Sequence, residues 1–219
     1  MEPTGFPSAY EPPKPPRQPT PLAKRIIPPN PLQSLVVVGG FVALLFVIEA
    51  LDTALGHTLD MHGIWPRDMD EWDGILWAPL LHVGWDHVTA NAVPFLVLGF
   101  LATAGGMSQF LGVTAIIWLF SGVGTFLIGQ PGVHLGASGV VFGFLTFLLV
   151  RGLFVRSLPQ IVIAVAVFAV YGSVLWGVLP TQSGISWEGH LSGGVGGIVA
   201  AWLVGRSFKQ TTARPALPG

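Results

Sequence analysis

The sequence has no cysteine and few charged side chains among its 219 residues. Without cysteine there is no disulfide framework, no thiolate metal site and no cysteine nucleophile. Charged residues make up 10%, against roughly 25% in soluble globular proteins, and hydrophobic residues reach 51%. The net charge of −1 provides no basic surface for nucleic acid. Glycine, which is frequent in membrane helices, occurs 29 times. The composition therefore indicates an integral membrane protein.

The N-terminal segment differs from the rest of the chain. Its first 31 residues hold eleven of the nineteen prolines and show no periodic apolar pattern. Proline removes backbone donors and resists helix formation, so we expect residues 1–32 to form a disordered, extended cytoplasmic tail. The segment is not a signal peptide, because the first apolar run is too long and lies too far from Met1. Residues 207–219 are expected to form a second, shorter cytoplasmic tail.

Six apolar segments follow the N-terminal tail. Each is long enough to cross a hydrocarbon core of roughly 30 Å, which takes about 20 helical residues. They lie near 33–51, 88–105, 108–130, 136–155, 159–179 and 189–206. The sequence therefore predicts an all-α membrane domain over residues 33–206, built as a bundle of six transmembrane helices with one long loop at 52–87.

The basic residues fix the expected orientation of this bundle. Nine of the ten lie before the first segment, between the fourth and fifth, or after the sixth, and only Arg67 lies on the opposite side. Cytoplasmic loops carry an excess of Lys and Arg, so both termini are expected in the cytoplasm. The acidic residues agree, because they fall outside or at the outer boundary: Asp52, Asp60, Asp68, Asp70, Glu71, Asp73, Asp86 and Glu188.

Polar residues begin the second, fourth and sixth segments. They are His82, His87 and Asn91, then Ser138, then His190. Such groups are costly inside a membrane and mark functional sites by default. Because these three segments all run inward from the outer face, their first turns lie at the same depth. The topology therefore predicts that these residues meet in one plane just below the outer surface.

Ser138 is the candidate nucleophile. Gly136 and Gly139 bracket it and leave open backbone for a substrate carbonyl. A neighbouring histidine can take the hydroxyl proton as general base, and free amides at a helix N-terminus can stabilise an oxyanion. The alternative is a helix-packing face, because small residues are typical of interfaces between membrane helices.

His190 lies beside a stripe of glycines. Gly189, Gly193 and Gly197 repeat every four residues and offer a smooth face to a neighbouring helix. The fourth segment also has a small face, so this packing would carry His190 to Ser138. The alternative is a histidine that is simply hydrogen-bonded inside the bundle.

The polar residues of the second segment suit an oxyanion site. His87 and Asn91 are four residues apart and share a helix face, and both carry donors. His82 is expected to brace the preceding loop. A metal site would normally need more ligands, so we expect neither metal nor cofactor. Glu188 and Asp86 are poorly placed to act as a third, acidic member, which favours a Ser–His dyad.

Together these motifs resemble the rhomboid family of intramembrane serine proteases, over about residues 33–206. The pieces that carry the resemblance are His82, His87-Val88-Thr89-Ala90-Asn91, Gly136-Ala137-Ser138-Gly139 and Gly189-His190-Leu191-Ser192-Gly193, followed by Gly197. The resemblance implies Ser138 as nucleophile and His190 as general base. It implies an oxyanion site made of His87, Asn91 and the Ser138 amide. It also implies cleavage of transmembrane segments of other proteins near the outer face.

Two positions depart from the pattern of the family. Many bacterial rhomboids have a Trp-Arg pair in the first loop, and the comparable stretch here is Glu71-Trp72-Asp73-Gly74. A tyrosine often follows the nucleophile by four positions and stacks on the histidine, and here that residue is Phe142. Its ring is expected to pack against His190, with ordinary apolar filling as the alternative.

Two other functions remain open. An inactive rhomboid-like protein that escorts membrane clients would usually lack the serine or the histidine, and both are present. A small channel or transporter would need polar residues through the whole bilayer, whereas the inner halves of the fourth and sixth segments are apolar. The expected partners are therefore transmembrane protein substrates within the lipid bilayer.

Overall fold

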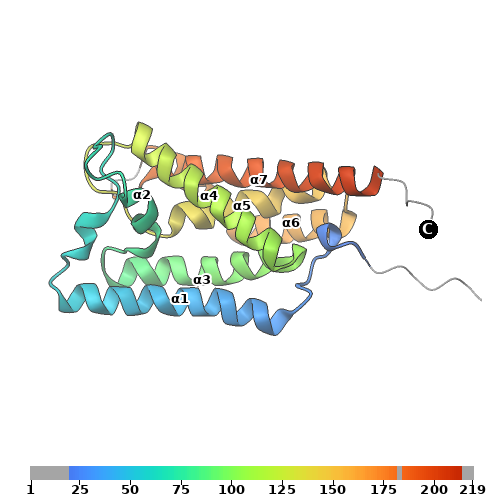
Figure 1. Ribbon diagram of the computed structural model, residues 1–219, viewed down its shortest axis with the longest axis horizontal. Helices are drawn as coiled ribbons and strands as arrows, with labels where there is room; N and C mark the ends of the chain where they lie inside the picture. Colours follow the sequence, from blue (N-terminus) through green and yellow to red (C-terminus); the bar gives the residue numbers. More distant parts are fainter. Residues whose placement is uncertain (1–19, 182–183, 214–219) are drawn as a thin grey trace, which may run out of the picture.

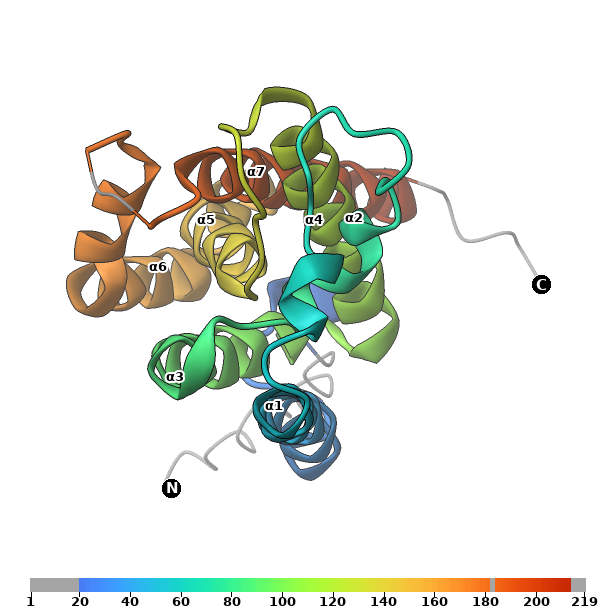
Figure 2. The ribbon, with the colours of Figure 1, turned by 90° about the vertical axis from the view of Figure 1, so that its left-hand side faces the viewer.

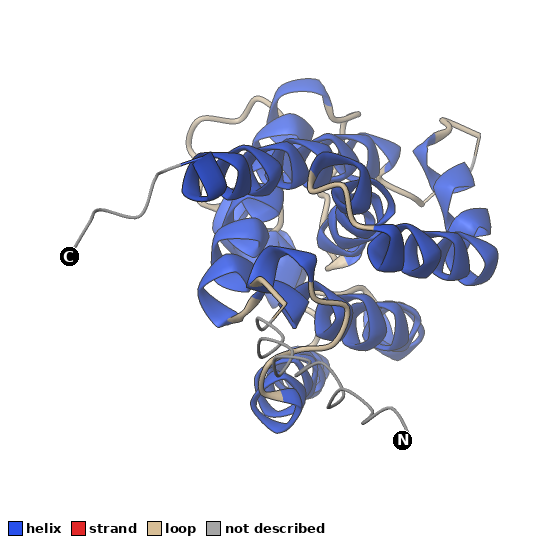
Figure 3. Cartoon of the chain, turned by 90° about the vertical axis from the view of Figure 1, so that its right-hand side faces the viewer, coloured by secondary structure: helices blue, strands red, loops and turns tan. Residues whose placement is uncertain are grey.

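The computed structural model describes residues 20–181 and 184–213. This part of the chain is helical, with no strand beyond an isolated bridge between Ile64 and His134 (Figure 3). The helices are α1 (Pro31–Ala54), α2 (Gly74–Trp77), α3 (Gly84–Ala102), α4 (Met107–Ile128), α5 (Ser138–Phe154), α6 (Leu158–Tyr171) and α7 (Trp187–Ala213). Short 3-10 turns occupy Leu22–Lys24, Leu59–His62, Ala78–Leu80, Thr103–Gly105 and Gly172–Val178. The prediction of an all-α chain is confirmed.

The long helices lie along one common direction (Figure 1). α1 and α3 lie along one edge of the bundle, α7 lies along the opposite edge, and α4 crosses obliquely between them. The start of the described chain and the end of α7 lie at the same end of the bundle, and the loop with α2 lies at the other. α3, α5 and α7 therefore all begin at the end that carries α2.

Five helices are long and apolar enough to cross a membrane. They are Pro31–Ala54, Gly84–Gly105, Met107–Ile128, Leu158–Val178 and Trp187–Thr211, while α5 is a shorter apolar helix of 17 residues. Large apolar side chains such as Val165, Phe168 and Val170 are exposed on α6, as expected of a helix that faces lipid. Each predicted segment coincides with one of these helices, and the fourth coincides with α5.

The central position of α5 explains why apolar side chains and glycines cover most of its surface. In an end-on view α5 lies among α3, α4, α6 and α7, with α1 outside α3 (Figure 2). Eleven of its seventeen residues are buried. Phe144 meets Phe95 of α3 and Phe110 of α4, with ring centroids 5.4 Å and 5.7 Å apart. A helix surrounded in this way needs no polar face.

Glycines allow α5 and α7 to pack backbone against backbone. A Cβ atom at Gly193 would overlap the Gly139 carbonyl oxygen, and one at Gly197 would overlap the Gly143 carbonyl oxygen. Small residues permit such close approach between membrane helices. Because Gly139 follows Ser138 directly and Gly193 is one turn from His190, this contact fixes the distance between the two helix starts.

The loop between α1 and α3 is shorter than the predicted 52–87, because α1 continues to Ala54 and α3 begins at Gly84. Ile64 exchanges backbone hydrogen bonds with His134, and Arg67 Nη1 donates to the Gly129 carbonyl at 2.8 Å. Asp73, at the position of the departure from Trp-Arg, accepts a hydrogen bond from the Trp77 indole at 3.1 Å. The loop is thereby attached to the segment that precedes Ser138.

Part of the predicted N-terminal tail is packed against the bundle. Gln160 Nε2 donates to the carbonyls of Ala23 and Arg25 at 2.8 Å and 3.0 Å, and Arg151 points to the same two carbonyls. The segment just before α1 is therefore ordered, which the proline content did not predict. Residues 1–19 and 214–219 lie outside the described residues.

Candidate functional site

Ser138 and His190 lie within hydrogen-bonding distance at the starts of α5 and α7. The Ser138 hydroxyl and His190 Nε2 are 2.8 Å apart, and His190 Nδ1 lies 2.9 Å from the Gly177 carbonyl oxygen. Because a carbonyl only accepts, Nδ1 carries the proton and donates it. In the neutral ring Nε2 is then the acceptor for the Ser138 hydroxyl. This is the arrangement of a nucleophile with its general base.

Two neighbours hold the His190 ring in place. The Phe142 ring stacks on it, with centroids 4.1 Å apart and planes inclined by 12°. Gly177, in the 3-10 turn Gly172–Val178, supplies the carbonyl described above. A Cβ atom at Gly177 would lie 3.0 Å from both the imidazole and the Phe142 ring, so a larger residue would crowd them. The acceptor for His190 Nδ1 is thus a backbone carbonyl and not a carboxylate. Glu188 Oε1 instead accepts a hydrogen bond from the backbone amide of Gln130 at 3.0 Å.

The backbone at Ser138 presents free amide groups. Ser138 is the first residue of α5, and the first helical hydrogen bond runs from the Val141 amide to the Ala137 carbonyl. The amides of Ser138, Gly139 and Val140 therefore have no acceptor within the helix. Together with the positive end of the helix dipole, they form a place where negative charge is favoured.

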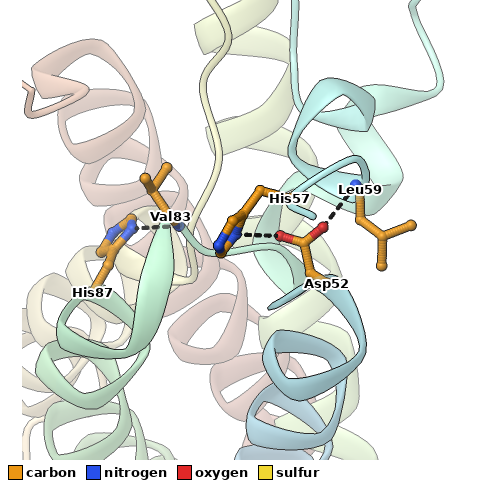
Figure 4. Close-up of polar contacts among 5 residues, drawn as sticks. All are labelled: Asp52, His57, Leu59, Val83 and His87. Atoms are coloured by element: carbon orange, nitrogen blue, oxygen red, sulfur yellow. Dashed lines mark hydrogen bonds and ion pairs between the residues drawn. The ribbon is translucent and has the colours of Figure 1, made fainter. Parts of the chain in front are cut away.

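His87 lies against the loop that leads to Ser138. The Val83 amide donates to His87 Nδ1 at 3.3 Å (Figure 4), so Nε2 carries the proton in the neutral ring. A Cβ atom at Gly136 would lie 2.9 Å from this Nε2, and Gly136 has φ +119°. Only glycine satisfies both the backbone conformation and the space. His87 thus turns a donor edge toward the approach to Ser138.

Asn91 lies one turn further along α3, on a buried face. Its side-chain amide donates to the His87 carbonyl at 2.9 Å, an interaction within its own helix. Among the described residues it makes no hydrogen bond to Ser138. The structure therefore brings together Ser138, His190, Phe142 and His87 more directly than it does Asn91.

His82 supports the loop that leads to Ser138. The Ala137 amide donates to His82 Nε2 at 3.2 Å, and the His82 ring lies edge-on to that of His87. Burial, with a smaller contribution from His87, lowers the pKa of His82 to about 4. The ring is therefore neutral near pH 7, as its role as an acceptor requires.

Two cavities flank the loop before Ser138. One of about 20 Å³ touches Ser138 and Gly139, and one of about 230 Å³ is lined by residues that include Val83, His87 and Leu135. The first is large enough for a single water molecule. The second offers room for part of a peptide beside His87.

Three contributors to this site were not predicted. Gly177 acts through its carbonyl, and a backbone acceptor leaves no signal in sequence. His134 contacts both Gln130 and Ser186, at 2.9 Å and 2.7 Å, and so connects the loop before Ser138 to the segment before α7. The Ser121 hydroxyl donates to the Gly189 carbonyl at 3.1 Å. The polar type of His134 and Ser121 was visible in the sequence, but their respective partners Ser186 and Gly189 lie 52 and 68 residues away along the chain.

Comparison with known proteins places the chain in a family. The Rhomboid domain model matches residues 69–207. Uncharacterised proteins of Mycobacterium tuberculosis and Mycobacterium leprae are 48% identical over 202 residues and 45% identical over 191. These matches cover 83% and 81% of this chain, and 84% and 76% of the relatives. A Bacillus subtilis protein with a provisional designation as a rhomboid protease is 30% identical over 160 residues, 69% of this chain and 74% of its own.

The chain thus combines a helical bundle, in which a serine and a histidine are paired at one end, with sequence similarity to one family. The chain belongs to the rhomboid family and is an integral membrane protein.

Proposed function

We propose that this protein is an intramembrane serine endopeptidase, which cleaves transmembrane segments of other membrane proteins with a dyad of Ser138 and His190. The observation that carries the proposal is the 2.8 Å contact between the Ser138 hydroxyl and His190 Nε2, with the opposite ring nitrogen held by the Gly177 carbonyl. A histidine fixed in this tautomer is ready to accept the serine proton. Membership of a family that includes proteases supports the same conclusion.

The proposed topology has six spans, with α5 as the fourth, over a protease domain of residues 33–206. Both termini lie in the cytoplasm, since the basic residues gather there. The 17 residues of α5 span about 26 Å, less than a hydrocarbon core of roughly 30 Å. Ser138 therefore lies a little below the outer surface, where water can reach it from outside.

A substrate helix enters sideways from the lipid and unwinds at its outer end. Unwinding is necessary because helical carbonyls are already hydrogen-bonded and covered by side chains, and lipid offers no replacement partners. The extended strand then lies beside the nucleophile loop, over the cavity next to His87. Substrates with Gly, Pro or polar residues near their outer end are favoured, because such helices unwind easily.

Acylation begins when the Ser138 oxygen attacks the scissile carbonyl and His190 Nε2 takes its proton. Negative charge then develops on the carbonyl oxygen. The Ser138 amide, the Nε2–H of His87 and the second amide hydrogen of Asn91 are the proposed donors to this oxyanion. Such preorganised donors each contribute about 3–4 kcal/mol when they act only in the transition state.

The tetrahedral intermediate collapses as His190 returns the proton to the leaving amine. Water then attacks the acyl-serine, with His190 again as base, and releases the second product. The stacked Phe142 ring keeps the imidazole plane fixed through both steps. No metal or cofactor takes part in this scheme.

The test is cleavage of a model transmembrane substrate by the purified protein in vesicles. Ser138→Ala and His190→Ala should each abolish cleavage, and the double variant should be no worse than either, because residues that act as a unit are non-additive. Ser192→Ala is a matched control, since that hydroxyl lies on α7 against Gly124 and away from the dyad. Robust cleavage by Ser138→Ala would exclude the serine mechanism.

A further inference from the structure

Acidic side chains from the outer end of α1 and the following loop gather around one histidine. Asp52 Oδ2 lies 3.3 Å from His57 Nδ1, and Asp52 Oδ1 accepts the Leu59 amide at 2.7 Å (Figure 4). One ligand atom each from Asp52, His57 and Asp60 lies within 4.8 Å of the other two. The sequence analysis expects Asp52 and Asp60 outside the membrane or at its outer boundary, and the structure shows Asp52 to be only 1% exposed.

Glu49 lies one turn before Asp52 on α1 and is close enough to interact with Asp52 and His57. It is 1% exposed, and neither carboxylate oxygen has a hydrogen bond within the described residues, although the Thr53 hydroxyl lies nearby. Asp60 Oδ1 is also buried without a partner. Burial of a charged carboxylate without compensation is costly. Buried oxygens of Glu49 and Asp60 are therefore without a hydrogen-bond partner beside Asp52 and His57.

The charges of this cluster are poorly balanced. Across residues 20–181 and 184–213, no Lys or Arg forms an ion pair with the three carboxylates, and His57 is their one basic neighbour. The carboxylates of Asp52, Asp60 and the neighbouring Glu49 repel one another when they are ionised. Either a shared proton or a bound cation must reduce the repulsion.

We propose that Asp52, His57 and Asp60 bind a divalent cation of the zinc type, with the buried carboxylate of Glu49 nearby as a further source of negative charge. One imidazole with carboxylates is a donor set suited to Zn²⁺, whereas Ca²⁺ and Mg²⁺ take oxygen ligands only. Two ligands about 2.0 Å from a tetrahedral zinc ion are about 3.3 Å apart. The separation of Asp52 Oδ2 and His57 Nδ1 is 3.3 Å.

The surroundings of the cluster suit a structural metal site. The Leu59 amide orients the Asp52 carboxylate, as outer hydrogen bonds do for metal ligands. The His57 side chain is 50% exposed, which gives an ion a path from the solvent. A bound ion would join α1 to the start of the loop that continues to Ile64 and its backbone pairing with His134. This site is separate from the proposed protease chemistry.

The experiment uses the purified full chain in detergent, stripped with EDTA and then titrated with Zn²⁺. Calorimetry and elemental analysis should give one Zn²⁺ per chain, and Tm should rise with free Zn²⁺. Ca²⁺ should bind at least tenfold more weakly. Asp70→Asn removes one exposed outer carboxylate outside the cluster and should bind as the wild type does.

Two variants distinguish the metal from a shared proton. Glu49→Gln should weaken Zn²⁺ binding at least tenfold and should raise the Tm of the metal-free protein, because it removes a buried charge. His57→Gly should weaken binding similarly, and it removes the imidazole without straining the backbone, because residue 57 has φ +62° and glycine adopts this freely. The proposal is overturned if Zn²⁺ leaves the wild-type Tm unchanged, if both variants bind as tightly as the wild type, or if Ca²⁺ binds as well as Zn²⁺.

Discussion

The contact between α5 and α7 provides a sharp test of how the dyad is positioned. A Cβ atom added at Gly193 would overlap the Gly139 carbonyl oxygen and lie 2.8 Å from the carbonyl carbon and 3.2 Å from the Cα atom. All three are backbone atoms of a buried helix, so they cannot turn aside as a flexible side chain would. In Gly193→Ala, α7 must therefore move away from α5.

The size of this movement sets the expected loss of activity. Non-bonded carbon atoms rest about 3.5–4.0 Å apart, so the helices must separate by about 1 Å. His190 is one turn from Gly193, and Ser138 adjoins Gly139. The displacement therefore falls on the 2.8 Å contact between the Ser138 hydroxyl and His190. A misplacement of about 1 Å costs on the order of 10²-fold in rate, so Gly193→Ala should lose about that much in kcat.

The adjacent Gly194→Ala is the matched control. Its added methyl group would meet Thr146 Cγ2 at 3.4 Å, which is ordinary contact, and alanine favours the helix by about 1 kcal/mol. It should cleave a transmembrane substrate at the wild-type rate with an equal or higher Tm. Rates are compared at equal amounts of folded protein. If folded Gly193→Ala matches Gly194→Ala in rate, the close contact of α5 with α7 does not position the dyad.

Four further outcomes are expected. Phe142→Tyr should retain most activity, whereas Phe142→Ala should lose it because the ring no longer orients His190. Truncation also costs about 3–5 kcal/mol of packing, so the rates are compared at matched folded fraction. A wild-type rate for Phe142→Ala would exclude an orienting role for the ring. Asn91→Ala should lower turnover about 10²-fold with little change in KM, and a raised KM with normal turnover would assign Asn91 to substrate binding. Burial lowers the pKa of His82 to about 4, below its unfolded value of about 6.5. Between these pH values the unfolded chain binds a proton that the folded protein does not. Stability is therefore lost as the pH falls from about 6.5 to about 4, by about 3 kcal/mol at most. Thermal unfolding should show a steeper pH dependence for wild type than for His82→Gln, and equal slopes would contradict this. A cysteine that replaces Asp70 should react with an impermeant thiol reagent in intact cells. Labelling of a cysteine that replaces Lys209, and not of the one at position 70, would invert the proposed topology.

The direction of the helices could be predicted from the sequence, and it accounts for most of the candidate site. Apolar segments alternate in direction, so the starts of α3, α5 and α7 had to lie at one end of the bundle. That reasoning brings His87, Ser138 and His190 together without any knowledge of contacts. The spacing from Ser138 to Phe142 likewise placed the ring on the face that meets His190.

The partners of these residues could not be predicted in the same way. The Gly177 carbonyl is a backbone group, and its position depends on how the turn after α6 folds back over α7. The cluster around His57 depends on a loop that returns Asp60 to the end of α1. Such contacts arise from turn geometry, which the hydrophobic pattern does not record. For Asn91 the sequence predicted the helix face but not the partner of the side chain, which donates a hydrogen bond to the His87 carbonyl of its own helix.

The most direct measurement of the central proposal is reaction of the purified protein with a fluorophosphonate probe, followed by mass spectrometry of the labelled peptide. An activated serine beside a neutral histidine should carry the label at Ser138. The label should disappear in Ser138→Ala, fall at least 10²-fold in His190→Ala and remain unchanged in Ser192→Ala. An unlabelled wild type, or equal labelling of wild type and Ser138→Ala, would contradict a serine protease with this dyad.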